Sequence, residues 1–159
     1  MTLKELLYHR TQGLYRSGDL ILAGNWGRLI LGIGPAHNRF YAEYLLDRIR
    51  VDEFPTAPSR LGCAFAFEDA QFTMGWNRGT PEYVYAVRLA DPTAPQHRGN
   101  MDWIDAMNEY RSFEGVEECA RRYWRGDDRD PRVWEVATMG GFVVEDRLTR
   151  IPENGEPDA

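Results

Sequence analysis

The chain has 159 residues, of which 43% are hydrophobic and 28% are charged, and its formal net charge is −6. This length fits one domain with one hydrophobic core, and we expect residues 1–151 to form it. The acidic balance argues against a broad nucleic-acid surface, because phosphate contacts need clustered Lys and Arg. Eighteen arginines accompany a single lysine, Lys4. This bias suits bidentate binding of phosphate, but a GC-rich genome would produce it equally well.

The sequence contains no membrane-spanning run and no signal peptide, since its opening apolar stretch is too short. We therefore expect a cytoplasmic protein, although secretion without a cleaved signal stays open. Cys63 and Cys119 have neither metal-ligand nor disulfide spacing, and no metal site is expected. Both are expected to be buried thiols. Residues 152–159, rich in Pro, Glu and Asp, are expected to be a disordered tail.

Short strands and one clear helix are expected in the first third of the chain. Residues 6–11 and 20–22 are typical of strands, and residues 24–28 of a turn-rich loop. The glycine-broken run 29–34 only superficially resembles a dinucleotide fingerprint, because the third glycine is missing. Asn38 is expected to cap a helix that extends to about Arg50. Helical spacing places five apolar residues on its core face: Phe40, Tyr41, Tyr44, Leu45 and Ile49.

The remainder mixes strands and helices and predicts an α+β domain. Residues 59–67 are expected to be extended and residues 68–76 a short helix, and 83–89 is the clearest strand. A polar connection over 97–103 precedes helices over 104–111 and 115–124. A strand over 132–138 and a Gly140-Gly141 turn into 142–144 are typical of a hairpin-like pair. In the second of these helices, the inward positions are Val116, Cys119, Ala120 and Tyr123.

Three segments, taken together, resemble the ADP-ribosyltransferase superfamily. They are Tyr8-His9-Arg10-Thr11, the stretch from Ser59-Arg60 into Gly62-Cys63-Ala64-Phe65-Ala66-Phe67, and Val133-Trp134-Glu135-Val136 before a glycine turn. The pattern is also similar to a bacterial family of unknown function with this fold. It departs from the superfamily at Arg10, where glycine is usual, and in lacking a tyrosine in the second segment. The resemblance implies a split antiparallel β core with flanking helices.

The resemblance further implies an NAD⁺ cleft built on these three segments. His9, Thr11 and the backbone near Arg10 would line its adenosine side, and His9 would hydrogen-bond the ribose. The guanidinium forks of Arg10 and Arg60 suit a pyrophosphate. Ser59 would supply a hydroxyl, and Phe65 or Phe67 would stack on nicotinamide. Each of these residues also has an ordinary structural interpretation, as an ion pair, a turn residue or part of the core.

Glu135 is the candidate catalytic residue. Cleavage of the nicotinamide–ribose bond passes through an oxocarbenium-like state, which a carboxylate beside the ribose stabilises by about 3–4 kcal/mol, by analogy with oxyanion-hole donors. The alternative is a solvent-facing strand residue, because alternate side chains of a strand point outward. Asp102 is a rival acid, or else the N-cap of the following helix.

The expected function is therefore transfer of ADP-ribose from NAD⁺, used as a substrate, to an unknown protein, nucleic-acid or small-molecule acceptor. One alternative is a catalytically inactive NAD⁺- or nucleotide-binding domain on the same scaffold. Another is an NAD⁺ glycohydrolase acting as a toxin or effector. Trp26 is expected either as a wall of the cleft or as a packed loop aromatic.

Overall fold

A computed structural model describes residues 6–75 and 82–151. These residues form a mixed α+β domain around one antiparallel seven-stranded sheet. The strand order is β2-β7-β4-β1-β3-β6-β5. Its strands are β1 (Leu7–Thr11), β2 (Leu20–Ile21), β3 (Ala64–Phe67), β4 (Glu82–Leu89), β5 (Gln96–Asn100), β6 (Trp134–Thr138) and β7 (Phe142–Ile151).

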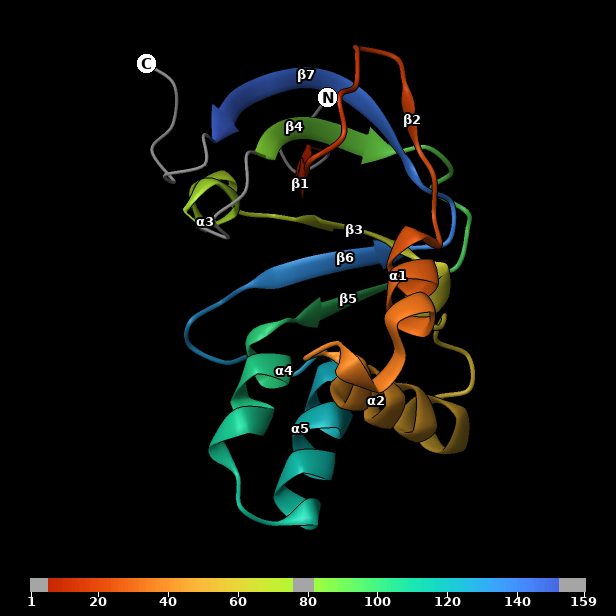
Figure 1. Cartoon of the computed structure of the whole chain (residues 1–159), viewed down its shortest axis with the longest axis vertical. Coiled ribbons are helices and arrows are strands. Elements are labelled where there is room, and N and C mark those ends of the chain that lie inside the picture. Colours follow the sequence, from red (N-terminus) through yellow and green to blue (C-terminus); the bar gives the residue numbers. More distant parts are fainter. Residues whose placement is uncertain (1–5, 76–81, 152–159) are drawn as a thin grey trace.

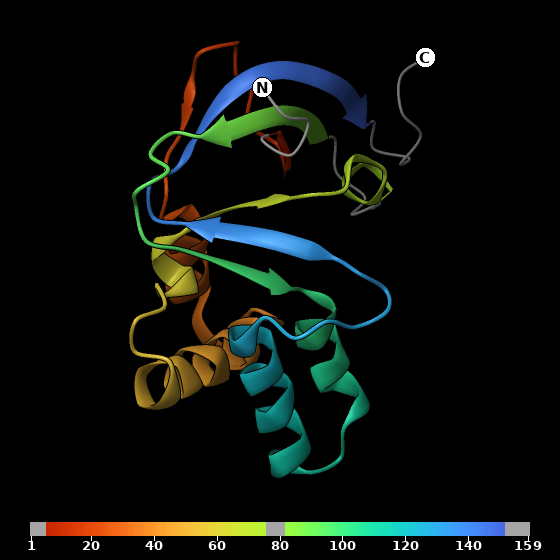
Figure 2. The ribbon, with the colours of Figure 1, turned by 180° about the vertical axis from the view of Figure 1, so that it is seen from behind.

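The helices lie mainly below the half of the sheet formed by β3, β6 and β5 (Figure 1). Turning the molecule by 180° gives the same layering, with β7 and β4 on top and α2, α4 and α5 below (Figure 2). The helices are α1 (Asn25–Ile33), α2 (Phe40–Glu53), α3 (Ala70–Met74), α4 (Asp102–Ala106) and α5 (Phe113–Arg125). Short 3₁₀ helices cover Gly34–Ala36, Arg60–Gly62 and Met107–Glu109.

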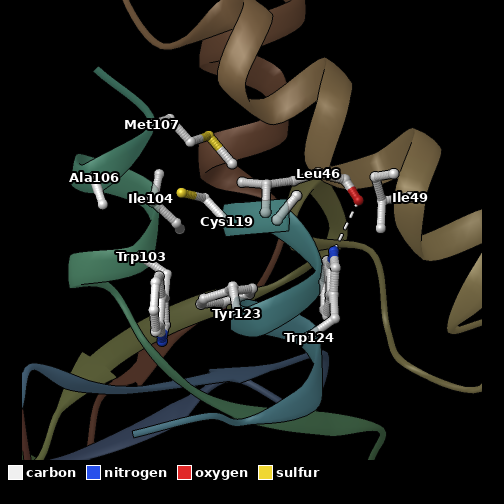
Figure 3. Close-up of a cluster of buried hydrophobic side chains, with 10 residues drawn as sticks. Leu46, Ile49, Trp103, Ile104, Ala106, Met107, Cys119, Tyr123 and Trp124 are labelled. Atoms are coloured by element: carbon white, nitrogen blue, oxygen red, sulfur yellow. Dashed lines mark hydrogen bonds between the residues drawn. The ribbon is translucent and has the colours of Figure 1, made fainter. Parts of the chain in front are cut away.

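Two clusters of buried side chains hold these layers together. The first joins α2, α4 and α5, and in it Trp124 Nε1 donates a hydrogen bond to the Leu46 carbonyl at 2.8 Å (Figure 3). The second lies between the two halves of the curved sheet. It includes Leu7, Ala66, Val136 and Phe142, which come from β1, β3, β6 and β7. The second cluster therefore buries one face of β3 and β6, and the first holds the helices together.

Most of the expected elements are confirmed. The strands expected over 6–11, 20–22, 83–89 and 132–138 correspond to β1, β2, β4 and β6, and the helix expected over 115–124 to α5. On α5 the residues expected inward are buried or half-buried. Cys63 and Cys119 are buried free thiols, as expected. Trp76 and the expected tail over 152–159 lie outside the described residues.

The loop expected over 24–28 is wrong, because α1 begins at Asn25. Gly27 is a contact residue and not a turn residue: a Cβ built on it would lie 2.0 Å from the Leu61 carbonyl oxygen. Gly24 supplies the left-handed N-cap with φ +96°. Glycine here serves the close approach of α1 to the 3₁₀ helix Arg60–Gly62, a requirement that appears only in the tertiary structure.

The core face expected for α2 is also partly wrong. Tyr41 and Tyr44 are 67% and 57% exposed, and the buried positions are Glu43, Leu46 and Ile49. The helix turns a carboxylate inward because Glu43 has partners there. The aromatic side chains that look like core residues therefore lie on the surface.

Two further expectations in the second half are wrong. The polar connection expected over 97–103 contains β5, an edge strand paired only with β6 among the described strands. The hairpin expected around Gly140-Gly141 is not formed. The turn exists, with Gly141 at φ +71°, but β6 pairs with β3 and β5, and β7 pairs with β4 and β2. It carries the chain from one half of the sheet to the other.

The close approach at Gly27 makes a direct test of the α1 packing. Gly27→Ala should lower the free energy of unfolding by at least about 2–3 kcal/mol, because the added methyl group overlaps a backbone oxygen. Gly32→Ala is the matched control in the same helix, since a Cβ there meets nothing within 4 Å. It should raise stability by about 0.5–1 kcal/mol through helix propensity. Urea unfolding of both variants measures this, and equal effects would contradict the packing.

Candidate functional site

The structure brings two of the expected site residues, Arg60 and Glu135, into direct contact. Arg60 opens the 3₁₀ helix before β3, and Glu135 lies on β6 opposite Phe67 of β3. Arg60 Nη1 donates to Glu135 Oε1. Both side chains are nearly inaccessible, with 7% and 3% of their surface exposed. The contact lies on the helix-covered face of the sheet, between β6 and α5.

Three further side chains complete this buried network. Arg60 Nε donates to both oxygens of Glu43 on α2 at 3.1 Å, and Nη1 donates to the Tyr123 hydroxyl on α5 at 2.7 Å. The Tyr123 hydroxyl in turn donates to Glu135 Oε1 at 2.8 Å. Trp26 Nε1 on α1 donates to Glu43 Oε1 at 2.9 Å. Side chains from α2, α5 and β6 thus bond the guanidinium of Arg60, and α1 joins the network through Glu43.

Aromatic rings enclose the same guanidinium. The centre of the Arg60 guanidinium lies 4.6 Å from the centroid of the Phe65 ring and 5.1 Å from that of Tyr123. Guanidinium groups favour such stacking, which strengthens where water is excluded. Phe65 therefore contacts an arginine of its own chain, at the position where the resemblance implies nicotinamide.

The electrostatics of the network keep Arg60 charged. Burial would lower the pKa of Arg60, but the negative charges of Glu135 and Glu43 outweigh it and raise that pKa well above its ordinary value. Burial also raises the pKa of the Tyr123 hydroxyl well above its usual range, with Arg60 opposing and Glu135 reinforcing the change. Tyr123 is therefore a hydrogen-bond donor at neutral pH. Burial raises the pKa of the neighbouring Cys63 thiol to about 12, so this cysteine is not a nucleophile.

His9 and Thr11 lie on the other face of the sheet. Alternate residues of a strand point to opposite faces, and Leu7 and the ring of His9 face the cluster between the sheet halves, where His9 lies 6.3 Å from Phe142. Glu135 faces the helices. His9 and Glu135 therefore belong to neighbouring parts of the sheet but do not face one another. Thr11 Oγ1 accepts a hydrogen bond from the Gly13 amide.

A hydrogen bond to the neighbouring strand β3 fixes the orientation of the His9 ring. Nδ1 lies 2.6 Å from the Phe65 carbonyl oxygen, which only accepts, so Nδ1 carries the proton. Burial lowers the pKa of His9, although this hydrogen bond opposes the change. The neutral ring therefore presents Nε2 as an acceptor. No residue of 6–75 or 82–151 supplies a partner for it.

The other expected ligands are engaged in contacts within the chain. Arg10 pairs with Glu82 of β4 and donates to the Thr73 carbonyl on α3, and its side chain is only 2% exposed. Ser59 Oγ donates to Asp47 Oδ1 at 2.9 Å. Neither side chain points into an open cleft among the described residues.

Asp102 is neither next to Glu135 nor the N-cap of α4. It is the first residue of α4, the cap position belongs to Met101, and Arg129 Nε donates to Asp102 Oδ2 at 2.5 Å. The capping role that we expected of Asp102 falls to Asn100, whose Oδ1 accepts from the Asp102 amide at 3.0 Å. An open hollow of about 490 Å³ lies nearby and is lined by Asp128, Arg129, Asp130 and Arg132.

Sequence reasoning missed Glu43, Trp26 and Tyr123 as partners of the site. Tyr123 was expected in the core, and Trp26 was expected as a wall of the cleft or as a packed loop aromatic, but not as a partner of Glu43. Glu43 gave one signal that could have been used: it is three residues before Leu46 and six before Ile49, on the stripe that the structure buries. Nothing in the sequence indicated which cation would meet it.

A family model described as "Protein of unknown function (DUF2441)" matches residues 24–147. The chain belongs to the DUF2441 family. No curated protein matches the chain. The DUF2441 segment contains the whole buried network of Trp26, Glu43, Arg60, Tyr123 and Glu135, whereas β1 with His9 precedes it.

The described part of this DUF2441 protein has neither a membrane-spanning helix nor a cluster of metal-ligating side chains. No helix of residues 6–75 and 82–151 is both long and apolar enough to cross a bilayer. Within the same residues no group of three or more His, Cys, Asp or Glu side chains is placed to hold a metal ion.

Removal of Arg60 should expose how much the fold depends on this network. Arg60→Met leaves two buried carboxylates without their cation, and the free energy of unfolding should fall by about 3–5 kcal/mol. Arg132→Met is the control: Arg132 is 70% exposed and pairs with Asp128, and its loss should cost no more than about 0.5 kcal/mol. Chemical denaturation measures both. If Arg60→Met lowered the free energy of unfolding by less than about 1 kcal/mol, that result would contradict a structural role for the network.

Two histidines should make stability depend on pH. Burial lowers the pKa of His9 and of His97, whose Nε2 bonds the Tyr123 carbonyl oxygen at 3.0 Å. Because the folded pKa lies below the unfolded value of about 6.5, the unfolded chain binds the proton first. The contribution of the two neutral histidines to the free energy of unfolding is complete above the unfolded pKa of about 6.5. It is lost as the pH falls through their lowered pKa in the folded state.

The free energy of unfolding should accordingly fall between neutral pH and about pH 5, by at most about 1.4 kcal/mol per pH unit for each histidine. His9→Gln and His97→Gln should each flatten this slope. Thermal unfolding followed by circular dichroism at several pH values measures it. A slope that both variants leave unchanged would show that other groups cause the dependence.

Proposed function

We propose that this domain binds NAD⁺, or another nucleotide that carries ADP-ribose, beside His9, and that Glu135 serves its fold and not its chemistry. The observation that carries the proposal is the acceptor nitrogen Nε2 of His9 on the central strand β1, which has no hydrogen-bond partner among residues 6–75 and 82–151. The strand order supports it as well, because β1, β3 and β6, the strands of the three segments with the superfamily resemblance, lie side by side.

The state of His9 selects the kind of group that it binds. A neutral imidazole whose Nδ1 proton is held by the Phe65 carbonyl offers only a lone pair at Nε2. A ribose hydroxyl can donate to that lone pair, whereas an ionised phosphate oxygen cannot. The ligand group must therefore be a hydrogen-bond donor, and the ribose hydroxyl that the resemblance implies for His9 is one.

The surroundings of Glu135 argue against its acting as the catalytic acid. A carboxylate that stabilises an oxocarbenium-like ribose must contact that ribose. Glu135 is 2% exposed, and its Oε1 is occupied by Arg60 and Tyr123. It also faces the helices, whereas His9 faces the space between the sheet halves. We therefore propose that a nucleotide bound at His9 does not contact Glu135.

Transfer of ADP-ribose to an acceptor is the second candidate. It is favoured by the adjacency of β3 and β6, which puts Phe65, Arg60 and Glu135 within one contact network. Catalysis by Glu135 would require Arg60 to leave its carboxylate and the ribose to enter from the helix side. The acceptor, or water in the case of a glycohydrolase, would then approach the same point.

Binding of NAD⁺ is tested by isothermal titration calorimetry with the wild-type chain. His9→Ala should weaken the affinity about tenfold, as expected for the loss of one hydrogen bond. His97→Gln is the matched control, because His97 is also half-buried but lies on β5 at the helix side. No heat of binding with NAD⁺ or ADP-ribose would contradict the proposal, as would equal effects of the two substitutions.

Release of nicotinamide separates the two candidates. We expect no release beyond the spontaneous rate from the wild-type chain, and Glu135→Gln should behave identically. Nicotinamide is quantified by chromatography, with and without a cell lysate as a source of acceptors. The contrary result is nicotinamide release by the wild type that Glu135→Gln abolishes, although the variant stays folded and still binds NAD⁺. That result would favour a transferase or glycohydrolase and would contradict a domain that only binds NAD⁺.

A further inference from the structure

Two exposed arginines on β7, Arg147 and Arg150, have no carboxylate partner among residues 6–75 and 82–151. The strand lies beside β4 in both views (Figures 1 and 2). The other arginines on the strands of the sheet, Arg10, Arg88 and Arg98, each pair with a carboxylate. In a chain with a net charge of −6, this end of β7 therefore carries a local surplus of positive charge.

A β-bulge in β7 puts both arginines on one face of the sheet. Positions three apart on a regular strand point to opposite faces. Here Arg150 is opposite Tyr83 and Arg147 is opposite Tyr85, because the register shifts between these two pairs. Directly paired residues share a face, so both arginine side chains leave the backbone on the face that Tyr83 and Tyr85 share. Bulges often re-aim a side chain in this way beside a functional site.

The ring of Tyr83 supports the Arg147 guanidinium, whose centre lies 5.6 Å from the ring centroid. The Arg147 side chain therefore leans from β7 onto the neighbouring strand β4. Tyr83 is half-buried, and its ring packs against that of Tyr85 with centroids 6.3 Å apart. A guanidinium that stacks on a ring keeps the N–H groups at its edge available for a planar anion.

The carboxylates next to these arginines in sequence are directed elsewhere. Glu145 accepts a hydrogen bond from Arg88 Nε. Asp146 is opposite Ala86, so its side chain leaves the backbone on the other face of the sheet. Neither carboxylate therefore neutralises Arg147.

We propose that Arg147 and Arg150, together with Tyr83, form a subsite for the pyrophosphate group of a nucleotide. Two guanidinium forks suit two phosphoryl groups, each of which presents several acceptor oxygens. The arginines that the sequence suggested for this group, Arg10 and Arg60, are buried and paired with carboxylates. The exposed pair on β7 supplies the cations that those two do not.

The subsite lies on the same face of the sheet as His9. His9 is paired with Tyr85, and Tyr85 is paired with Arg147. Since β4 alone separates β1 from β7, the two backbones are about 10 Å apart. The neutral His9 ring only accepts at Nε2, so the phosphates of a ligand need a separate, cationic partner. The identity of the ligand as a nucleotide rests on the proposed function, whereas binding of the anion does not require His9.

Isothermal titration calorimetry of the full chain at low ionic strength tests the subsite, with pyrophosphate, ADP-ribose and adenosine as ligands. Arg147→Gln and Arg150→Gln should each weaken the affinity for pyrophosphate and for ADP-ribose about tenfold, as expected for the loss of a charge-assisted hydrogen bond. Neither substitution should change the affinity for adenosine, which carries no phosphate. Added salt should weaken the binding of both phosphorylated ligands, because it screens exposed charges.

Arg132→Gln is the matched control, since it removes an exposed guanidinium outside the subsite and should leave all three affinities unchanged. Thermal unfolding should show unchanged stability for each variant, because the substituted side chains are exposed. Absence of pyrophosphate binding would overturn the inference, as would equal effects of Arg147→Gln and Arg132→Gln. Binding of ADP-ribose that needs His9 but neither arginine would also overturn it and would leave the proposed function standing. Pyrophosphate binding that depends on Arg147, without any binding of ADP-ribose, would support the anion subsite and contradict the proposed function.

Discussion

The architecture depends on one cation in a nearly dry environment. Arg60 neutralises Glu43 and Glu135, and each of these charges would be costly to bury alone. The three groups come from α2, β6 and the 3₁₀ helix Arg60–Gly62. Local unfolding of any one of these elements would therefore leave a buried charge without its partner. Tyr123 and Trp26 extend the same dependence to α5 and α1. The buried hydrogen bonds of Arg60 thus connect the helical layer to the sheet.

This constraint also determines the surface of the protein. A helix can turn only one stripe toward its core, and α2 turns the stripe of Glu43 because the partners of Glu43 lie there. Tyr41 and Tyr44 are consequently left in solvent. The inward glutamate and the apolar outer face are two results of the same rotation of α2.

Elements with a strong local period could be predicted from the sequence, and those set by distant contacts could not. The alternation of residues 83–89 and the helical spacing of residues 115–124 gave β4 and α5. Glu43 and Glu135 are separated from Arg60 by 17 and 75 positions, so no local pattern joins the three. Glu135 was singled out as a catalytic candidate, and the ion pair that surrounds it was not foreseen. The strand β5 was missed because its pairing with β6, and not its composition, makes it a strand.

The position of β1 has a consequence for how the chain assembles. This strand lies between β4 and β3, so Tyr8 takes its neighbours from Ala86 and Phe67, which follow much later in the sequence. Closing such long loops costs entropy before any contact stabilises the product. Chains dominated by distant pairings fold slowly for their size. During folding, β1 stays unpaired until β3 and β4 have come together around it. Until then, the exposed edges of β1 can pair with other chains.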